Sequence, residues 1–189
     1  MLRGPQQGFA VALMLISLFA AADIGAAVQD QKPQGISARV VREVRHELVT
    51  LPYYGVFDWL EYVVQPDNTV VLRGQVVRPS TKSDAENRVK DIEGVSRVVN
   101  EIEVLPLSSN DDRLRRALYR AIYGTNSPLF RYATQAVPPI HIVVRNGRAV
   151  LKGIVANKGD ANLAYIRARG VPGLFEVKNE LKIESELPQ

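Results

Sequence analysis

The sequence predicts an α+β protein of two tandem αββαβ units, each a small mixed three-stranded sheet packed against two helices. An internal repeat, apolar residues at helical spacing, and β-rich segments separated by turn residues together predict this class. The 189 residues have room for two small domains, and 46% apolar with 23% charged residues is typical of globular chains.

The repeat is visible when the chain is compared with itself at a shift of 79 residues. Residues 70–104 then lie without a gap on residues 149–183, and ten of the 35 positions are identical. The identical pairs are Val71/Val150, Leu72/Leu151, Gly74/Gly153, Val76/Val155, Ala85/Ala164, Arg88/Arg167, Gly94/Gly173, Val98/Val177, Asn100/Asn179 and Glu101/Glu180. We therefore expect two repeats, 36–106 and 111–185, joined by a short polar segment.

The first repeat has the pattern helix, hairpin, helix, strand. Ser37 is a possible N-cap for a helix whose apolar residues recur at helical spacing as far as Pro52. Two β-rich segments, 57–64 and 70–77, flank a turn, and Pro79 opens the second helix. The last strand is expected over 95–105.

The second repeat follows the same plan. Asp111 or Asp112 is expected to cap its first helix. The inward residues of this helix are Leu114, Leu118, Ala121 and Ile122. A strand ends at Asn146-Gly147, the pair that favours a type I′ hairpin because both central positions need positive φ. A strand over 150–155, a helix over 161–169 and a strand over 174–183 complete the repeat.

Four glycines are predicted to have structural roles. Gly94 and Gly173 stand where a helix gives way to a strand, a position that favours a left-handed residue. Gly74 and Gly153 lie inside strands, which indicates a bulge or the close approach of a helix.

The N-terminus has the order of a secretory signal. Arg3 precedes an apolar run of 14 residues, 9–22, and small residues follow as far as Ala27. The run is shorter than the roughly 20 residues of a bilayer span, although a retained anchor is the alternative. We expect a cleaved signal peptide over 1–27, a flexible segment over 28–35, and a mature protein in the periplasm.

The residue content argues against an enzyme. The chain has no cysteine, which excludes thiol nucleophiles and cysteine-bound zinc. It has two histidines, so very few residues could form a Ser-His-Asp triad. His46 is expected on the outward side of its helix, and His141 faces away from Ile140 and Ile142. We expect no catalytic residues, no metal and no cofactor.

Charge is distributed unequally between the repeats. Residues 36–106 carry nine basic and eleven acidic side chains, whereas residues 111–187 carry thirteen basic and seven acidic ones. No acidic residue occurs between Arg113 and Gly159. A basic patch often binds nucleic acid, but an exported protein rarely meets it, and we expect no such partner.

The first helix of the second repeat is predicted to carry a membrane-binding face. Arginines and tyrosines lie opposite its apolar stripe, a combination that suits an anionic lipid headgroup region. The predicted lipid-binding residues are Arg113, Arg116, Tyr119, Arg120, Tyr123 and Arg131. The alternative is an ordinary basic surface that keeps the protein soluble.

The repeated motifs resemble the BON-domain pattern. The first repeat has VVLRGQV at 70–76 and GVSRVVNEI at 94–102, and the second has AVLKGIV at 149–155 and GLFEVKNEL at 173–181. The resemblance implies an αββαβ fold without catalytic residues or cofactor, usually in periplasmic proteins linked to osmotic stress and envelope integrity. Some members of the family bind anionic phospholipid.

One departure from the pattern opens a second hypothesis. The first repeat carries Tyr53, Tyr54, Phe57, Trp59 and Tyr62 around the start of its hairpin. This aromatic segment is the basis for an alternative function, a protein-interaction or assembly module that docks a partner or a second subunit.

Overall fold

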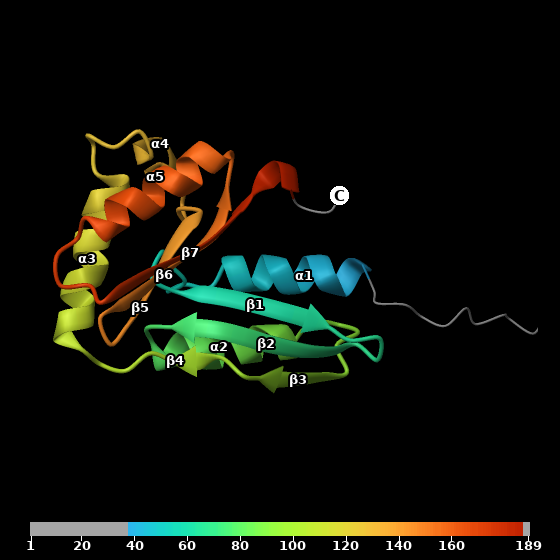
Figure 1. The fold of residues 1–189 in the computed structure, drawn as a ribbon. Coiled ribbons are helices and arrows are strands. Elements are labelled where there is room, and N and C mark those ends of the chain that lie inside the picture. Colours follow the sequence, from blue (N-terminus) through green and yellow to red (C-terminus); the bar gives the residue numbers. More distant parts are fainter. Residues whose placement is uncertain (1–37, 187–189) are drawn as a thin grey trace, which may run out of the picture. The chain divides into compact units, whose positions relative to one another are not determined.

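The computed structural model describes residues 38–186, which belong to one compact unit (Figure 1). The predicted signal peptide, the segment 28–35 and the N-cap Ser37 lie outside the described residues. Within 38–186, no helix is both long enough and apolar enough to cross a bilayer.

The first repeat contains two helices and one mixed sheet (Figure 1). Its elements are α1 (Ala38–Val49), β1 (Trp59–Val64), β2 (Thr69–Val76), α2 (Pro79–Lys90), β3 (Arg97–Asn100) and β4 (Glu103–Val104). β1 pairs antiparallel with β2, and β2 pairs in parallel with β3 and then β4. Val44, Leu72 and Val89 are fully buried in its core.

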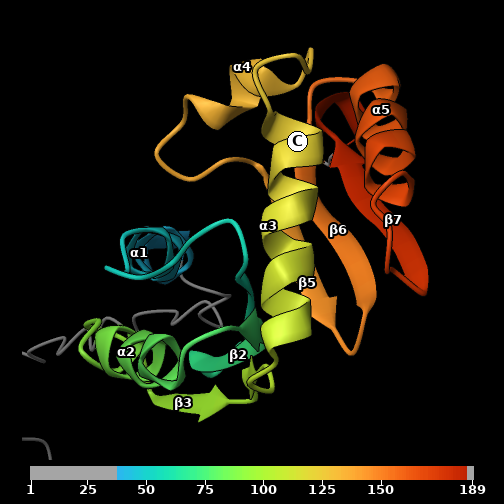
Figure 2. The same cartoon turned by 90° about the vertical axis from the view of Figure 1, so that its left-hand side faces the viewer.

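The second repeat has the same topology, as the repeat predicts. Its elements are α3 (Ser109–Tyr123), α4 (Phe130–Ala133), β5 (Ile140–Arg145), β6 (Arg148–Val155), α5 (Lys158–Arg169) and β7 (Glu176–Ile183), followed by a 3-10 turn η1 (Glu184–Glu186). β5 and β6 are antiparallel, whereas β6 and β7 are parallel. α3 packs against β5, α5 packs against β7, and the two helices lie side by side (Figure 2). Helix α4 was not predicted, because a single turn carries no apolar periodicity.

The cap of α3 differs from the prediction. Ser108, rather than Asp111 or Asp112, is the N-cap, and its side chain accepts a hydrogen bond from the Asp111 amide. Asp111 is only 1% exposed, and its carboxylate accepts hydrogen bonds from the amides of Asn146 and Gly147, both at 2.8 Å. Asn146 and Gly147 have φ values of 51° and 73°, which confirms the predicted turn. The buried carboxylate therefore fixes the hairpin tip.

The predicted strand over 95–105 is broken in the first repeat, although the asparagine that both repeats share stands within the unbroken last strand of the second repeat. Asn100 accepts a hydrogen bond from the amide of Ile102 and donates one to the carbonyl of Lys82 on α2. Asn179 accepts from the amide of Leu181 and donates to the carbonyl of Ala161 on α5. Each asparagine ties the last strand of its repeat to the second helix. In the first repeat the strand divides there into β3 and β4.

The strand glycines are required by the neighbouring strand rather than by a helix. Gly74 and Gly153 have φ values of 121° and 124°. A Cβ at Gly74 would lie 1.9 Å from the Trp59 carbonyl oxygen, and one at Gly153 would lie 1.8 Å from that of Pro139. The positive φ expected at Gly94 and Gly173 is confirmed, at 95° and 93°, although α2 and α5 end several residues earlier.

Replacing Gly153 with alanine is expected to destabilise the second repeat by about 3 kcal/mol, because the positive φ is strained and the new methyl group meets backbone. Gly170→Ala is the control in the same repeat, since its Cβ would meet its nearest atom, the Arg167 carbonyl oxygen, at an ordinary 3.4 Å. Urea denaturation measures both changes in the free energy of unfolding. Equal stability of the two variants would contradict the requirement for glycine at 153.

Candidate functional site

Three of the six predicted lipid-binding residues form one exposed row. Arg113, Arg116 and Arg120 lie on the outward face of α3, and Tyr119 lies half-buried beside them. None of the three arginines makes an ion pair with a carboxylate of residues 38–186, and Arg113 donates a hydrogen bond to Asn110 instead. The guanidinium groups of Arg116 and Arg120 are therefore free to meet an anion.

Tyr123 does not belong to this surface, contrary to the prediction. Its side chain is only 2% exposed, and its hydroxyl donates to the Ile140 carbonyl at 2.7 Å while accepting from the Ile140 amide at 2.9 Å. The chain after α3 folds back over the last turn, so Leu129 and Tyr132 join Tyr123 in the second core. Burial raises the pKa of the Tyr123 phenol.

Arg131 lies on α4, apart from the row on α3. It forms an ion pair with Asp160 at the start of α5, and its guanidinium carbon lies 4.9 Å from the centre of the Tyr132 ring. The Tyr132 hydroxyl also donates to Asp160, at 2.7 Å. Burial alone would raise the pKa of Asp160, but these hydrogen bonds hold it below its usual value. Arg131 thus fastens α4 to α5.

Four of the nine remaining basic residues of the second repeat make ion pairs with carboxylates, namely Arg115, Arg145, Arg148 and Lys152. Arg145 meets Glu103 at 2.6 Å, and Lys152 meets Glu61 at 3.5 Å, so both pairs join the two repeats. Arg115 is 3% exposed and donates to the Val144 carbonyl at 2.7 Å. The acidic first repeat therefore neutralises part of the basic second repeat, whereas the three arginines on the outward face of α3 keep their charge without a carboxylate partner among residues 38–186.

The first repeat also completes the surface around Arg116 and Arg120. Val56 and Phe57 line a shallow hollow of about 240 Å³ together with Arg116, Tyr119 and Arg120. The Phe57 ring meets the Tyr119 ring edge to face, with centroids 6.3 Å apart. The candidate site thus combines two free cations with an apolar and aromatic floor, and residues of both repeats build it.

Segment 54–59 supplies Val56 and Phe57 because it lies along β5. The amide of Ile142 donates to the Val56 carbonyl at 2.8 Å, which satisfies an edge group of β5. The segment itself is held by buried Asp58, whose carboxylate accepts hydrogen bonds from the amides of Gly55 and Val77 at 3.0 and 2.7 Å. Burial raises the pKa of Asp58.

His141 is the centre of this contact. It faces away from Ile140 and Ile142, as predicted, yet it is only 6% exposed because the first repeat covers it. Its Nδ1 lies 2.6 Å from the Asp58 carbonyl oxygen, and that geometry assigns the proton to Nδ1 because a carbonyl only accepts. The rings of Trp59 and Tyr54 lie 5.1 and 5.5 Å from the imidazole. His46 is exposed on α1.

The aromatic segment was predicted to dock a partner or a second subunit, but three of its rings contact the second repeat of the same chain. Those rings are Tyr54, Phe57 and Trp59. Sequence reasoning missed this contact because nothing within one repeat shows which surface a neighbouring repeat covers. No feature of the sequence indicates that a histidine on the predicted solvent side of a strand is buried by a neighbouring repeat.

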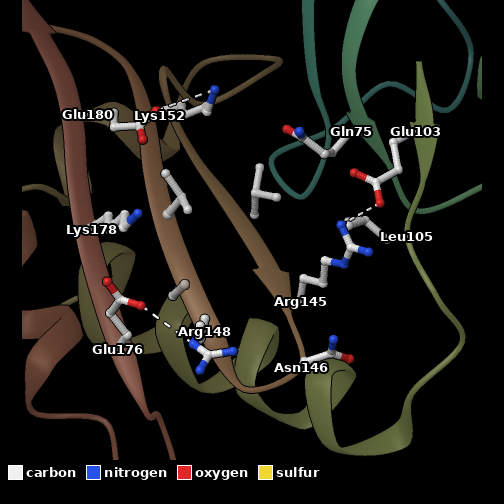
Figure 3. A pocket seen from close by; sticks show the side chains of 13 residues that line it. Gln75, Glu103, Leu105, Arg145, Asn146, Arg148, Lys152, Glu176, Lys178 and Glu180 are labelled. Carbon is white, nitrogen blue, oxygen red and sulfur yellow. Dashed lines mark ion pairs between the residues drawn. The ribbon is translucent and has the colours of Figure 1, made fainter. Parts of the chain in front are cut away.

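A cleft of about 500 Å³ lies beside this contact, between the outer face of the second sheet and residues of β2 and β4 (Figure 3). Ion pairs surround an apolar floor that includes Leu105, Val143 and Val150. The carboxylates that line it all have a basic partner, as the dashed lines in Figure 3 show. Within 38–186, no group of three His, Asp or Glu side chains is placed to hold a metal ion.

The BON-domain family model matches residues 60–106 and 110–185. The chain belongs to the BON-domain family. Two solved structures of CdsD, a structural protein of the type III secretion system of Chlamydia trachomatis, are similar to it at 13% identity and a TM-score of 0.31. These matches cover 80% of this chain and 93% and 98% of the CdsD chains, the latter being a C-terminal domain. No curated protein matches this chain.

The contact between the two BON domains is expected to weaken in acid. Burial lowers the pKa of His141, against hydrogen bonds to the backbone of Asp58 and Gly55 that oppose the shift. The stability that the neutral imidazole contributes is therefore complete at pH values above 6.5, the pKa of His141 in the unfolded chain. This stability is lost as the pH falls toward the lower pKa of His141 in the folded protein. His141→Asn, which never charges, should lose less thermal stability than the parent between about pH 7.5 and about pH 5.

His46→Asn is the matched control, and its melting temperature should follow that of the parent at every pH. Circular dichroism measures all three proteins, and the titration of Asp58 is common to them. If the parent and His141→Asn respond equally to acid, the neutral buried imidazole does not contribute to the contact.

Proposed function

We propose that this BON protein is a non-enzymatic, exported envelope protein that binds anionic phospholipid through α3 of its second domain and supports envelope integrity under osmotic stress. BON-domain proteins are generally periplasmic or envelope-associated, which supports this setting. In the proposal the protein needs no cofactor and does not bind nucleic acid.

One observation carries the lipid assignment, namely the row of arginines on α3 without carboxylate partners beside an apolar hollow. Basic side chains near an anionic membrane each contribute about 1 kcal/mol. Tyrosine and phenylalanine rings suit the boundary between headgroups and acyl chains, and Tyr119 and Phe57 stand next to Arg116 and Arg120. A surface kept only for solubility has no need of apolar side chains between its cations.

Arg116→Glu with Arg120→Glu is expected to reduce binding to phosphatidylglycerol vesicles by roughly 30-fold or more, because at least 2 kcal/mol of attraction is lost. Neither residue is buried, so the fold should persist. Vesicle co-sedimentation measures the affinity, and binding by the parent should fall as salt screens the arginines.

Arg42→Glu with Arg45→Glu is the matched control. Both residues are exposed on α1, and the pair changes the net charge by the same amount. This variant should bind phosphatidylglycerol vesicles nearly as strongly as the parent does. Neither the parent nor this variant should bind phosphatidylcholine vesicles. The assignment to α3 is wrong if the Arg116/Arg120 variant binds as well as the parent, or if the control loses as much.

A further inference from the structure

The second sheet has one open edge. Its strand order is β5-β6-β7, so β7 has a partner strand on one side only within the described residues. The opposite edge, β5, is covered by segment 54–59 through the hydrogen bond from Ile142 to Val56. An uncovered edge strand of eight residues is a template for another strand, and proteins usually shorten or interrupt such edges.

Charges alternate along one face of β7. Successive side chains of a strand point to opposite faces, so Glu176, Lys178, Glu180 and Lys182 share a face. Figure 3 shows the first three on the same side of β7. Glu176 and Glu180 reach Arg148 and Lys152 on β6, whereas Lys178 and Lys182 make no ion pair within 38–186. The edge therefore presents two lysines that make no ion pair within the described residues, although Lys182 is near enough to Glu61 to help lower the pKa of that carboxyl.

This pattern is complementary to itself in one antiparallel register. When two β7 strands pair about a twofold axis at Asn179, Glu176 faces Lys182 of the other molecule and Lys178 faces its Glu180. By symmetry all four cross-strand charge pairs are opposite in sign, and each gives a lysine the partner that it lacks. Opposite charges across strands stabilise pairing, whereas like charges directly opposite destabilise it.

Neighbouring registers and the parallel direction are disfavoured by the same charges. An axis at Lys178 places that lysine opposite itself and Glu176 opposite Glu180, and an axis at Glu180 places Lys178 opposite Lys182. Parallel strands in register place every charge opposite its own kind. If the pairing shifts by one residue, the charged side chains of the two strands lie on opposite faces of the joined sheet. An axis at Val177 or at Leu181 also joins opposite charges, but it leaves two of the four charged residues of each β7 without a β7 residue opposite. The register at Asn179 pairs all four charges of β7 with an opposite charge.

The other face of the same register is apolar on both sides of the axis. Val177 faces Leu181 of the other molecule, and Ile183 lies opposite the segment just before its β7, which includes Phe175. The Phe175 side chain is 80% exposed, and the other three are half-buried, so pairing would remove apolar surface from water. Ile166, on the helix that covers β7, is 66% exposed as well.

The first BON domain lacks these features. Its equivalent edge is divided into β3 and β4, and Val99 interrupts the charges on the outer face. Glu103 on that edge is already paired with Arg145. The self-complementary edge is therefore a property of the second domain alone.

We infer that this protein forms a symmetric homodimer in which β7 pairs antiparallel with β7 of a second molecule about Asn179, joining two three-stranded sheets into one of six strands. In the single molecule the amide of Leu181 donates to the Asn179 side chain at 3.2 Å. In the dimer this amide donates instead to a backbone carbonyl of the partner molecule. The interface is isologous, as closed twofold dimers require.

Charge reversal tests the register. For the mature chain, sedimentation velocity should show a concentration-dependent monomer–dimer equilibrium. Lys178→Glu and Glu180→Lys should each weaken dimerisation by roughly tenfold or more, since each sets like charges opposite at two symmetric places. Lys158→Glu, on an exposed lysine at the start of α5, should leave the equilibrium unchanged.

Mixing the two single variants gives the decisive result. The glutamate introduced by Lys178→Glu in one molecule would face the lysine introduced by Glu180→Lys in the other. A heterodimer should therefore form at concentrations where each variant alone stays monomeric. This restoration does not depend on whether one variant is slightly less stable than the parent. A parent that stays monomeric at all concentrations, a Lys178→Glu variant that dimerises like the parent, or a mixture that stays monomeric would overturn the inference.

Discussion

The docking of segment 54–59 along β5 is the interaction on which the other features depend. It closes one edge of the second sheet, covers His141, and brings Val56 and Phe57 to the side of Arg116 and Arg120. Without this contact, the two BON domains would be joined by a short linker and a few exposed ion pairs, each of which contributes little. The same contact leaves β7 as the uncovered edge of its sheet.

Charge is arranged around that joint. The first domain is acidic and the second is basic, and two pairs that link them, Arg145 with Glu103 and Lys152 with Glu61, lie beside the docked segment. Lys152 also lies 5.7 Å from the centre of the Trp59 ring. Opposite charges pair where the domains meet, whereas the arginines on the outward face of α3 have no carboxylate partner among residues 38–186. Electrostatic asymmetry in the sequence thus serves both the joint and the candidate membrane surface.

The sequence predicts the fold well because the fold is repeated and local. The shift of 79 residues, the Asn146-Gly147 turn and the glycines each depend on nearby residues, and the structure confirms the αββαβ plan and the positive φ values. The candidate site was predicted only in part. Tyr123 satisfies helical periodicity on the outward side, but the returning chain after α3 covers it, and no periodicity encodes that cover. Contacts between the domains depend on tertiary structure in the same way.

Amide hydrogen exchange at Ile142 tests the central contact most directly, because this amide donates across the domain boundary to Val56. The account predicts slow exchange in the parent and faster exchange in Trp59→Ala, while the amide of Leu151, which is buried in the second core, stays protected in both. Tyr53→Ala, which removes an exposed ring outside the contact, should leave Ile142 protected. Rapid exchange at Ile142 in the parent would contradict the docking of the first domain on β5.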